Sequence, residues 1–467
     1  MNIDNIILNT DSYKASHWLQ YPPNTTSVLS YIEARGGEYP EAVFFGLQMF
    51  LKKYLSKPIT QEMIDEAGPI LKAHGEPFNK EGWEHILKEH NGYLPIRIRA
   101  VPEGTVVPIK NILASVENTD PKCFWLTSYI ETSLLRAVWY PLTVATKSRA
   151  IKSVIKRYLE ETADEEAMGG LAFKLHDFGA RGVSSFESAG IGGAAHIVNF
   201  MGTDTITGML FAMEYYNETE VPAFSVPAAE HSSITTWLKD GELDAYKNML
   251  EQFGGKFPIV SVVSDSYDIY NAVENMWGGA LKDMVVESGS TLVVRPDSGD
   301  PAEVVAKVAL LLDATFGSTI NSKGYKVLNN TRILQGDGLS TLADFEVILA
   351  KLKGYNFSTD NVVFGMGGGL LQQVNRDTMQ FAMKACSAVI DGNNVDVYKD
   401  PVTDEGKWSK RGRLELYRNK DTGAYTTGIA AHGADLENDL VLETVFENGK
   451  IVKEYTFSEV RANAELK

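Results

Sequence analysis

The stretch Leu292-Val-Val-Arg-Pro-Asp-Ser-Gly-Asp300 indicates the fold class. Its apolar start, Leu292–Val294, is typical of a short, fully buried strand. One cation, two carboxylates and a glycine follow at once, and Pro301 then opens an amphipathic stretch, Ala302–Leu312, that we expect to be a helix. The free N–H groups at the start of such a helix can bind an anion. A single loop of this kind is more often only a salt-bridged connection, so only recurrence of the pattern indicates a functional site.

The same pattern recurs between Gly170 and Gly369. Apolar or small-residue segments alternate with stretches of helical period, and polar residues follow each segment. The predicted strands are Lys174–Phe178, Ile197–Met201, Ala223–Val226, Ile259–Val263, Leu292–Val294, Arg332–Leu334 and Val362–Phe364. Such a series predicts an α/β fold with a parallel sheet that closes as an irregular barrel or near-barrel. In barrels of this type the C-terminal ends of the strands carry the site.

The two ends of the chain have a different pattern. Apolar residues alternate with arginines over Ile96–Ala100, which is typical of a strand with one buried face, and strand-like segments joined by Gly, Asn and Asp turns follow Gln380. We predict that both ends build one discontinuous, mainly antiparallel β-sheet domain, residues 1–145 and 385–467. The barrel, residues 146–384, would be inserted in it.

The composition restricts the class of protein. The 467 residues are 44% hydrophobic and 22% charged, as in an ordinary globular protein, and the net charge of -17 argues against binding to nucleic acid or to an anionic membrane. Two cysteines, Cys123 and Cys386, provide neither a disulfide framework nor a cysteine-based zinc site and fit a reducing compartment. Without a signal peptide or an apolar run of about 18 residues, we expect a cytoplasmic protein that does not span a membrane.

Two groups of candidate residues suit a phosphorylated substrate. The glycines of Gly365–Gly369 allow backbone N–H groups to approach a phosphate closely, although a flexible turn is the ordinary interpretation. Asp265, Asp297 and Asp337 follow adjacent predicted strands. They could serve a polyphosphate bound to Mg²⁺, an ion that takes a few carboxylates together with water and phosphate oxygens.

Two further candidates suit an aromatic substrate and catalysis. Phe178 precedes Arg181 closely, which offers a stacking face beside a cation, but a phenylalanine at a strand end is also ordinary core. His231 follows Glu230, and a single histidine is more often structural than catalytic. The run Gly190–Ala195 matches G-x-G-x-x-A without a preceding strand, so we reject a dinucleotide site; P-loop, zincin and hydrolase-elbow motifs are absent from the sequence.

Taken together, the motifs resemble those of the nicotinamide phosphoribosyltransferase family. The matching segments run in family order over essentially the whole chain: Thr10–Lys14, Gln20–Asn24, His176–Gly179, Arg181–Ser185, Gly202–Thr205, Ser225–Ser232, Val263–Asp268, Arg295–Gly299, Gln335–Gly338 and Gly367–Gln372. Met366 departs from the small polar residue that is common at that position, which puts only a side-chain contact in doubt.

The resemblance implies a fold and an activity. The fold would be that of type II phosphoribosyltransferases, an irregular α/β barrel with an antiparallel-sheet domain, in a head-to-tail homodimer with sites at the interface. The activity would make nicotinamide mononucleotide and pyrophosphate from nicotinamide and phosphoribosyl pyrophosphate in NAD salvage. Mg²⁺ and ATP are the implied cofactors, with Mg²⁺ held mainly through the substrate pyrophosphate near Asp265 and Asp297.

The resemblance also implies a role for each site residue. Phe178 and Tyr13 of a second subunit would sandwich the nicotinamide ring, Asp204 would accept from its carboxamide, and His231, beside Asp265, would be phosphorylated transiently by ATP. Asp297 would lie near the reacting centre. The remaining implied substrate-binding residues are Arg181, Ser261, Arg295, Gly336, Asp337, Gly367, Gly368 and Arg376. The implied phosphate contacts, some of them crossing the dimer, are Arg35, Lys384, Lys399 and Lys407.

Three alternatives remain open at this point. A nicotinate phosphoribosyltransferase would share the fold, but Asp204 would place a carboxylate against the carboxylate of nicotinate. A barrel lyase or aldolase with a phosphate site is weakened by the lack of an obvious Schiff-base lysine at a strand end. A non-catalytic binding role is possible for any fold, but the many acidic and basic candidates make it a poor primary interpretation.

Overall fold

The chain folds as two compact units. The computed structural model describes residues 3–403, 408–430 and 437–466. The first unit comprises Met1–Thr146, Ala212–Thr219 and Asn375–Glu465, and the second comprises Lys147–Phe211, Glu220–Val374 and Leu466–Lys467. Among the described residues, no helix is both long and apolar enough to cross a bilayer.

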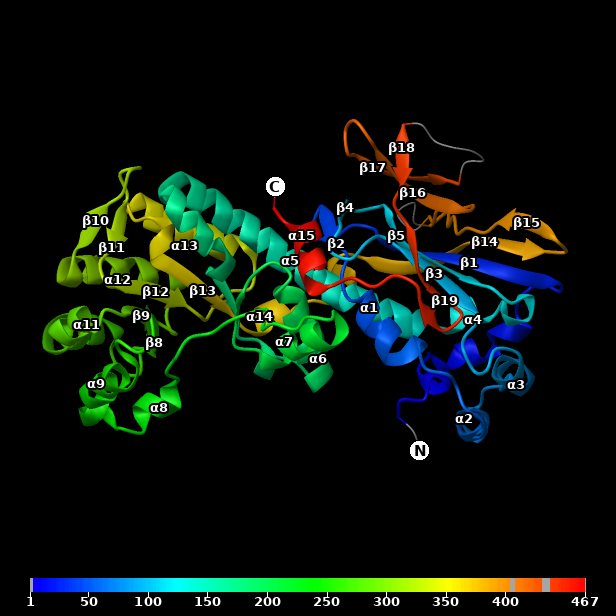
Figure 1. Ribbon diagram of the computed structural model, residues 1–467, viewed down its shortest axis with the longest axis horizontal. Coiled ribbons are helices and arrows are strands. Elements are labelled where there is room, and N and C mark those ends of the chain that lie inside the picture. Colours follow the sequence, from blue (N-terminus) through cyan, green and yellow to red (C-terminus); the bar gives the residue numbers. More distant parts are fainter. Residues whose placement is uncertain (1–2, 404–407, 431–436, 467) are drawn as a thin grey trace. The chain divides into compact units, whose positions relative to one another are not determined.

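The first unit is built on an antiparallel sheet that joins the two ends of the chain (Figure 1). Its strand order is β15 (Asn393–Asp396), β14 (Phe381–Ile390), β1 (Thr25–Ala34), β5 (Ile112–Asn118), β3 (Ile96–Ala100), β19 (Glu443–Glu447) and β20 (Lys450–Ile451). Strands β1 and β14 pair along most of their length, with Tyr31 opposite Lys384. Strand β14 spans the predicted boundary between residues 384 and 385 and lies wholly in the first unit.

Smaller elements complete the first unit. The minor strands are β2 (Glu41–Val43), β4 (Val106–Pro108), β16 (Leu414–Asn419), β17 (Tyr425–Ile429) and β18 (Asn438–Leu440). The helices and helical turns are η1 (Ile6–Leu8), η2 (Ser12–Leu19), α1 (Leu47–Phe50), η3 (Leu51–Leu55), α2 (Gln61–His74), α3 (Lys80–Glu89), η4 (Pro121–Cys123), α4 (Leu126–Tyr129), η10 (Arg376–Thr378) and α15 (Phe457–Ala464). Helices α5 (Glu131–Thr162) and α7 (Ile206–Tyr215) belong to both units.

The second unit contains the parallel sheet that the sequence predicts. Its order is β7 (Gly202–Thr203), β6 (Leu175–Asp177), β13 (Val362–Met366), β12 (Thr331–Gln335), β9 (Thr291–Arg295) and β8 (Ile259–Val263). Val262, Val294, Ile333 and Phe364 are fully buried, as expected for parallel strands covered on both faces. The chain therefore combines this parallel sheet with a separate antiparallel sheet in the first unit. This confirms the predicted α/β fold class.

Irregular backbone closes this parallel sheet into a near-barrel. Phe224 makes a parallel bridge to Gly202 of β7, and Ala228 makes one to Ser261 of β8. Of the predicted strand Ala223–Val226, only Phe224 makes such a bridge, and Ala228 lies beyond the predicted strand. The predicted strand Ile197–Met201 is wrong, because this apolar run continues from the end of helix α6 (Phe186–His196) as a turn.

Helices cover this sheet (Figure 1). The best defined is α12 (Pro301–Phe316), which begins with Pro301 in its first turn and is capped by Asp300, whose side chain accepts from the Glu303 N–H at 2.9 Å. The others are η5 (Glu165–Phe173), η6 (Ala180–Gly182), α8 (His231–Thr235), η7 (Lys239–Gly241), α9 (Glu242–Phe253), α10 (Ile269–Asn271), η8 (Ala272–Ala280), α11 (Lys282–Ser288), α13 (Leu342–Gly354), η9 (Thr359–Asn361) and α14 (Gly368–Leu371). A hairpin of β10 (Ser318–Ile320) and β11 (Lys326–Leu328) follows α12.

Candidate active site

A cavity of about 520 Å³ lies at the carboxyl ends of the parallel strands, entirely within the second unit. It is lined by residues that follow β6, β7, β9, β12 and β13 and by the start of α8: Phe178, Ala180, Arg181, Gly182, Asp204, Thr205, Glu230, His231, Ser232, Arg295, Asp297, Gly336, Asp337, Gly367 and Gly368. Strand ends from distant parts of the sequence therefore meet at one place, as the barrel argument predicts.

Phe178 provides an aromatic face beside a cation. Its N–H donates to the Met366 carbonyl at 3.0 Å, which fixes the residue at the end of β6. The ring lies against Gly365, where an added Cβ would come 2.0 Å from ring atom Cε2, so only glycine fits there. The guanidinium carbon of Arg295 lies 5.4 Å from the ring centroid. A flat heteroaromatic ring stacked on Phe178 would thus lie beside a positive charge.

Asp204 presents one free carboxylate oxygen at the end of β7. The hydroxyl of Ser225 donates to Oδ1 at 2.6 Å, and the Asp204 N–H donates to the Asp177 carbonyl at 3.0 Å. Within the described residues, Oδ2 accepts no hydrogen bond. The side chain is exposed toward solvent and lines the cavity. It is therefore available to accept from an N–H donor on a ligand.

Asp177 lies beneath this group as a buried carboxyl. Its Oδ1 accepts from the Gly179 N–H at 2.7 Å, whereas Oδ2 has no hydrogen-bond partner among the described residues. Burial raises the pKa of Asp177 to about 6, against the opposing effect of the Gly179 hydrogen bond. The nearby charge of Asp204 acts in the same direction as burial.

His231, Asp265 and Asp297 form a connected acidic–imidazole group. His231 Nε2 lies 2.9 Å from Asp265 Oδ1, and His231 Nδ1 lies 3.9 Å from Asp297 Oδ2. The other Asp265 oxygen accepts from the Asp297 N–H at 3.0 Å and from the Ser298 hydroxyl at 2.6 Å. Asp265 thereby uses both oxygens to hold the imidazole and the loop after β9. The His231 ring is about half exposed and remains accessible from the cavity.

Arg295 and the glycine turns complete the cavity wall. Arg295 donates to Asp297 Oδ1 from Nη2 at 2.6 Å and from Nε at 3.1 Å, so the cation is fixed beside the carboxylate. A Cβ on Gly336 would come 3.1 Å from Arg295 Nε. At Gly368, by contrast, an added Cβ would meet nothing within 4 Å. The absence of a side chain at Gly368 therefore leaves open backbone facing the cavity, which is what close approach of a phosphate requires.

Not every predicted site residue lies at this cavity. Ser261 is buried in β8, where its backbone bonds to Pro227 and Ala229. The residues that belong to the first unit are Tyr13, Arg35, Arg376, Lys384 and Lys399. Lys407 lies outside the described residues.

Four of these first-unit residues form a basic cluster. Burial and the like charges of Arg35, Lys399 and Arg376 lower the pKa of the Lys384 ammonium, against the opposite effect of Glu131. Arg35 is held by a hydrogen bond from Nε to the Gln380 carbonyl at 3.2 Å. Such a cluster on an acidic protein is suited to a polyanion. Tyr13 belongs to the same unit, and its side chain is 55% exposed.

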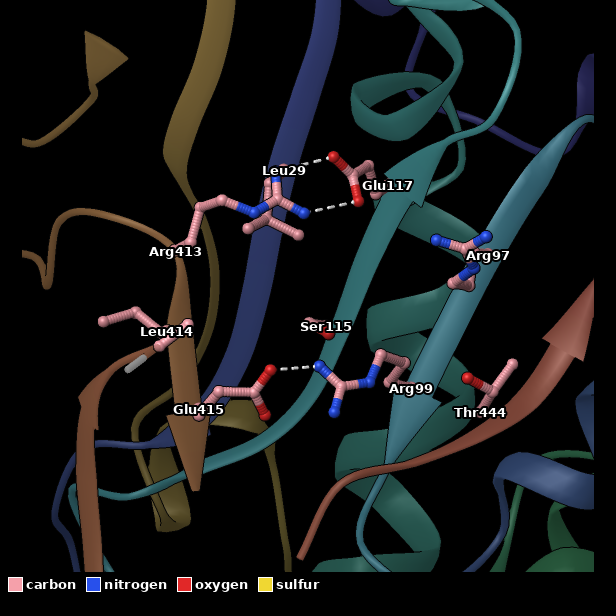
Figure 2. Close-up of a pocket in the computed structure, with 10 residues that line it drawn as sticks. Leu29, Arg97, Arg99, Ser115, Glu117, Arg413, Leu414, Glu415 and Thr444 are labelled. Atoms are coloured by element: carbon pink, nitrogen blue, oxygen red, sulfur yellow. Dashed lines mark hydrogen bonds and ion pairs between the residues drawn. The ribbon is translucent and has the colours of Figure 1, made fainter. Parts of the chain in front are cut away.

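A second polar cavity, of about 290 Å³, lies in the first unit and has a different character. Figure 2 shows Arg413 facing Glu117 and Arg99 facing Glu415 across it. Arg413 makes a two-pronged ion pair, at 2.8 and 2.9 Å. Arg97, which also lines it, pairs with Glu447 at 2.6 Å. Its cations are therefore neutralised by carboxylates of the chain.

Several groups that shape the first cavity were not predicted from the sequence. Ser225 orients Asp204 from a segment 21 residues away, and Ser298 holds Asp265 across 33 residues. Glu230 and Thr205 line the cavity directly. Ser225, Glu230 and Thr205 lie within the matching segments quoted above, so the resemblance marked their neighbourhood without assigning them a contact.

Comparison with known proteins identifies the family of the chain. A family model described as "Nicotinate phosphoribosyltransferase (NAPRTase) family" matches residues 173–450, and one described as "Nicotinamide phosphoribosyltransferase, N-terminal domain" matches residues 5–98. The chain is 54% identical to the nicotinamide phosphoribosyltransferase of Xanthomonas campestris pv. campestris, over 99% of this chain and 98% of the relative. The chain belongs to the nicotinamide phosphoribosyltransferase family. The family, the enzyme class and the pentosyl-transfer function that the sequence predicts are thereby confirmed.

Other relatives extend this result. The nicotinamide phosphoribosyltransferase of Acinetobacter baylyi is 33% identical over 97% of this chain and 95% of the relative. The solved nicotinate-nucleotide pyrophosphorylase of Pyrococcus furiosus superimposes with a TM-score of 0.63 at 18% identity, over 99% of this chain and 96% of that one. At this identity the superposition shows the fold, and it agrees with the predicted family architecture of a barrel with an antiparallel sheet.

Proposed function

We propose that the cavity of the second unit is where the chain transfers phosphoribosyl from phosphoribosyl pyrophosphate to nicotinamide, giving nicotinamide mononucleotide and pyrophosphate in NAD salvage. One observation carries the proposal: Phe178, the free oxygen of Asp204 and the Arg295–Asp297 pair line one cavity. These groups suit, in turn, an aromatic ring, an amide and a sugar that becomes positively charged. The membership of the nicotinamide phosphoribosyltransferase family supports the assignment.

Asp204 is the proposed determinant of the base. Ser225 occupies Oδ1, which directs Oδ2 toward an N–H donor. Nicotinamide offers an amide NH₂ that can donate to this oxygen, whereas nicotinate would bring its own carboxylate against it. A like charge at hydrogen-bond distance is unfavourable, so the site favours the amide.

The transfer step follows from the charges around the cavity. The ring nitrogen of nicotinamide attacks the anomeric carbon of the ribose with its lone pair, while the carbon–oxygen bond to pyrophosphate breaks and its electrons leave with the pyrophosphate. Positive charge develops on the sugar, as in other oxocarbenium-like transfers. Asp297 stabilises that charge electrostatically, and stacking on Phe178 holds the attacking nitrogen in place. Arg295 orients Asp297 through two hydrogen bonds to Oδ1.

The donor set fits Mg²⁺ bound together with the substrate. Asp297 Oδ2 accepts no hydrogen bond within the described residues, and Asp337 is exposed in the same cavity. One or two carboxylates plus phosphate oxygens are a usual magnesium environment. When bound, the ion would neutralise charge on the departing pyrophosphate. Asp265 is the poorer ligand, because both of its oxygens already accept hydrogen bonds.

His231 is the proposed acceptor of a phosphoryl group from ATP. With the proton on Nε2, His231 donates a hydrogen bond to Asp265 Oδ1, which leaves the lone pair of Nδ1 free on the side of Asp297. That lone pair would attack the terminal phosphorus of ATP, the bond to the bridging oxygen would break, and ADP would leave. The added negative charge near Asp297 would alter how the pyrophosphate is held, which couples ATP to the transfer.

A second copy of the chain is the proposed source of the missing contacts. Tyr13 and the basic cluster of Arg35, Arg376, Lys384 and Lys399 belong to the first unit, whereas the cavity belongs to the second. In a head-to-tail homodimer, Tyr13 of one copy would close over the ring that lies on Phe178 of the other, and the basic cluster would meet the phosphates. The two cysteines are free thiols, which fits the proposed cytoplasmic location.

The test of the function compares nicotinamide with nicotinate, each with phosphoribosyl pyrophosphate and Mg²⁺, with and without ATP. We expect mononucleotide from nicotinamide, more of it with ATP, and loss of the ATP effect in His231→Ala. A preference for nicotinate would overturn the role of Asp204 but not the reaction type. An ATP effect that survives in His231→Ala would overturn the phosphorylation step alone.

The dimer is tested by mixing two inactive variants, Tyr13→Ala and Asp204→Ala. If both residues serve one site from different copies, mixed dimers recover one intact site, which is about a quarter of the sites after statistical exchange. No recovery after verified subunit exchange would show that each site uses a single copy.

A further inference from the structure

A cluster of metal-binding side chains lies in the first unit, away from the cavity described above. His85 is on helix α3, Asp120 precedes the turn η4, and Cys123 ends that turn. The possible ligand atoms of these three residues all lie within 4.8 Å of one another. His90, directly after α3, adds a second imidazole. The cluster thus joins two segments that are about 30 residues apart in the sequence.

The hydrogen bonds of the cluster converge on one atom. His85 Nε2 lies 2.7 Å and His90 Nε2 lies 2.6 Å from the same oxygen, Asp120 Oδ2. The other Asp120 oxygen accepts from the Lys122 N–H at 2.8 Å, which fixes the carboxylate. The Cys123 side chain is fully buried, and its thiol has no hydrogen-bond partner among the described residues. The His85 imidazole, the fixed carboxylate and the buried thiol therefore face one small region. His90 reaches the same carboxylate oxygen but must move closer to the other ligand atoms to complete a set of four.

We propose that His85, His90, Asp120 and Cys123 form a binding site for Zn²⁺. Zinc takes imidazole nitrogen, carboxylate oxygen and thiolate sulfur, and it prefers four ligands in tetrahedral geometry. The Cys123 thiol would lose its proton to solvent, and each imidazole would bind through the Nε2 lone pair with its proton on Nδ1. Thiolate and carboxylate together balance the charge of the ion, which suits a largely buried position. Mg²⁺ is excluded as the occupant by the sulfur ligand.

Small movements would convert the hydrogen-bonded cluster into a metal site. Zinc–nitrogen and zinc–oxygen bonds of about 2.0–2.2 Å place neighbouring ligand atoms roughly 3.3 Å apart, so the two imidazoles must each retreat by about half an ångström. Both imidazoles are partly exposed, at 18% and 26%, which leaves room for that motion. A zinc site with ligands from histidine, aspartate and cysteine needs only one cysteine. It is therefore compatible with a chain that has two cysteines, too few for a cysteine-based site.

The site has a natural role in holding the first unit together. It would link the end of helix α3 to the segment between β5 and α4. The aromatic cluster beneath it already joins these parts, with Trp83 and Trp125 ring centroids 4.9 Å apart. An ion bound only by the folded chain raises the free energy of unfolding by RT ln(1 + [ion]/Kd), and the unfolding temperature rises with it. The proposal therefore concerns a structural metal and not the transfer reaction.

The experiment uses the full-length protein, stripped with a chelator and titrated with Co²⁺ alone. Tetrahedral Co²⁺ bound to a thiolate gives a sulfur-to-metal charge-transfer band in the near ultraviolet and d–d bands in the visible. We expect one equivalent to bind, the bands to disappear on addition of Zn²⁺, and Zn²⁺ to raise the melting temperature. The charge-transfer band should be lost in Cys123→Ser, and affinity should fall by about tenfold or more in His85→Gln.

Two controls separate the site from general effects. Cys386→Ser removes the other buried thiol, which bonds weakly to the Leu29 carbonyl at 3.6 Å, and His74→Gln removes an exposed imidazole on α2. Both variants should bind Co²⁺ as the parent does. Absence of the band in the parent, or its persistence in Cys123→Ser, would overturn the proposal. If Cys123→Ser does not fold, His85→Gln and His90→Gln decide: unchanged affinity in both would show that the cluster is a hydrogen-bond network only.

Discussion

The two polar cavities differ in whether their charged side chains are already paired with other groups of the chain. In the first unit, Arg413 and Arg99 face carboxylates across a cavity of about 290 Å³, so their charges are neutralised within the chain. In the second unit, Asp204 and Asp297 each keep one oxygen without a hydrogen bond, and Gly368 leaves open backbone beside them. Polar lining alone therefore does not mark a site. The first-unit cavity has its cations paired with carboxylates, whereas the second-unit cavity keeps the exposed carboxylate of Asp204 without a paired cation among the described residues, beside open backbone.

The largest expected effect comes from the Asp297 carboxylate. Asp297→Asn keeps the shape but removes the charge that stabilises the cationic sugar, and we expect kcat to fall by about 10²–10³-fold. The measurement is steady-state kinetics with nicotinamide at saturating phosphoribosyl pyrophosphate. Glu415→Gln is the matched substitution in the first-unit cavity and should leave kcat unchanged. Equal losses in the two variants would break the distinction between the cavities.

The second prediction concerns the buried carboxyl of Asp177. Burial raises its pKa from 3.8 to about 6, so the folded chain holds a proton that the unfolded chain has lost. Its stabilising contribution is full below pH 3.8 and disappears as pH rises through 6, a change of about 3 kcal/mol. Asp177→Asn should therefore gain stability relative to the parent as pH rises across that window, measured by denaturant unfolding.

Asp360 supplies a control of opposite sign for this pH dependence. Burial acts to raise its pKa, but the charges of Lys174 and Arg332 outweigh it and lower the pKa. The stability that Asp360 contributes is present above the unfolded pKa and is lost as pH falls. Asp360→Asn should thus lose stability relative to the parent near neutral pH, and this loss should shrink in acid. The same pH trend in both variants would refute the assignment to Asp177.

The sequence predicted the elements of the second unit well where the signal was local. Arg295, Pro296 and Asp297 follow a buried strand and precede a helix that begins at Pro301, and the structure has this arrangement. Proline at a helix start and an apolar run before a polar turn are short-range signals. The run Ile197–Met201 misled the prediction because apolar residues at the end of a helix look like a buried strand.

The contacts that define the site could not be predicted from short stretches of sequence. Ser225 directs Asp204, and Asp265 holds both His231 and the Asp297 backbone, across segments that only the fold brings together. Ser225 carries no pattern that distinguishes it from a surface serine, and the place of Asp265 after a predicted strand marks it as a candidate without naming its backbone partner. The irregular segment that closes the near-barrel was predicted as a strand. Its two isolated bridges depend on partners in β7 and β8, which the local sequence does not show.

The third prediction tests the open backbone of the cavity. A Cβ on Gly368 would touch no other atom of the structure within 4 Å, so Gly368→Ala should fold normally. The new methyl group would occupy the space proposed for a phosphate, and we expect KM for phosphoribosyl pyrophosphate to rise about tenfold with little change in thermal stability. Gly354→Ala, at the end of α13, meets equally open space away from the cavity and should leave KM unchanged. An unchanged KM in Gly368→Ala would place the phosphate elsewhere.

The smallest effect is expected at the paired charges of the first unit. Arg413 and Glu117 make two hydrogen bonds, and although burial acts to raise the pKa of Glu117, Arg413 lowers it. Because Arg413 is 45% exposed, solvent screens the pair, and a double-mutant cycle with Arg413→Ala and Glu117→Gln should give a coupling of about 1 kcal/mol in unfolding free energy. The more exposed pair of Arg97 and Glu447 should couple less. Kinetic constants for both substrates should stay at parent values in Arg413→Ala, because the Arg413 guanidinium is already paired with the Glu117 carboxylate. A tenfold rise in KM for phosphoribosyl pyrophosphate in that variant would instead make the first-unit cavity a substrate site and end the contrast on which the assignment rests.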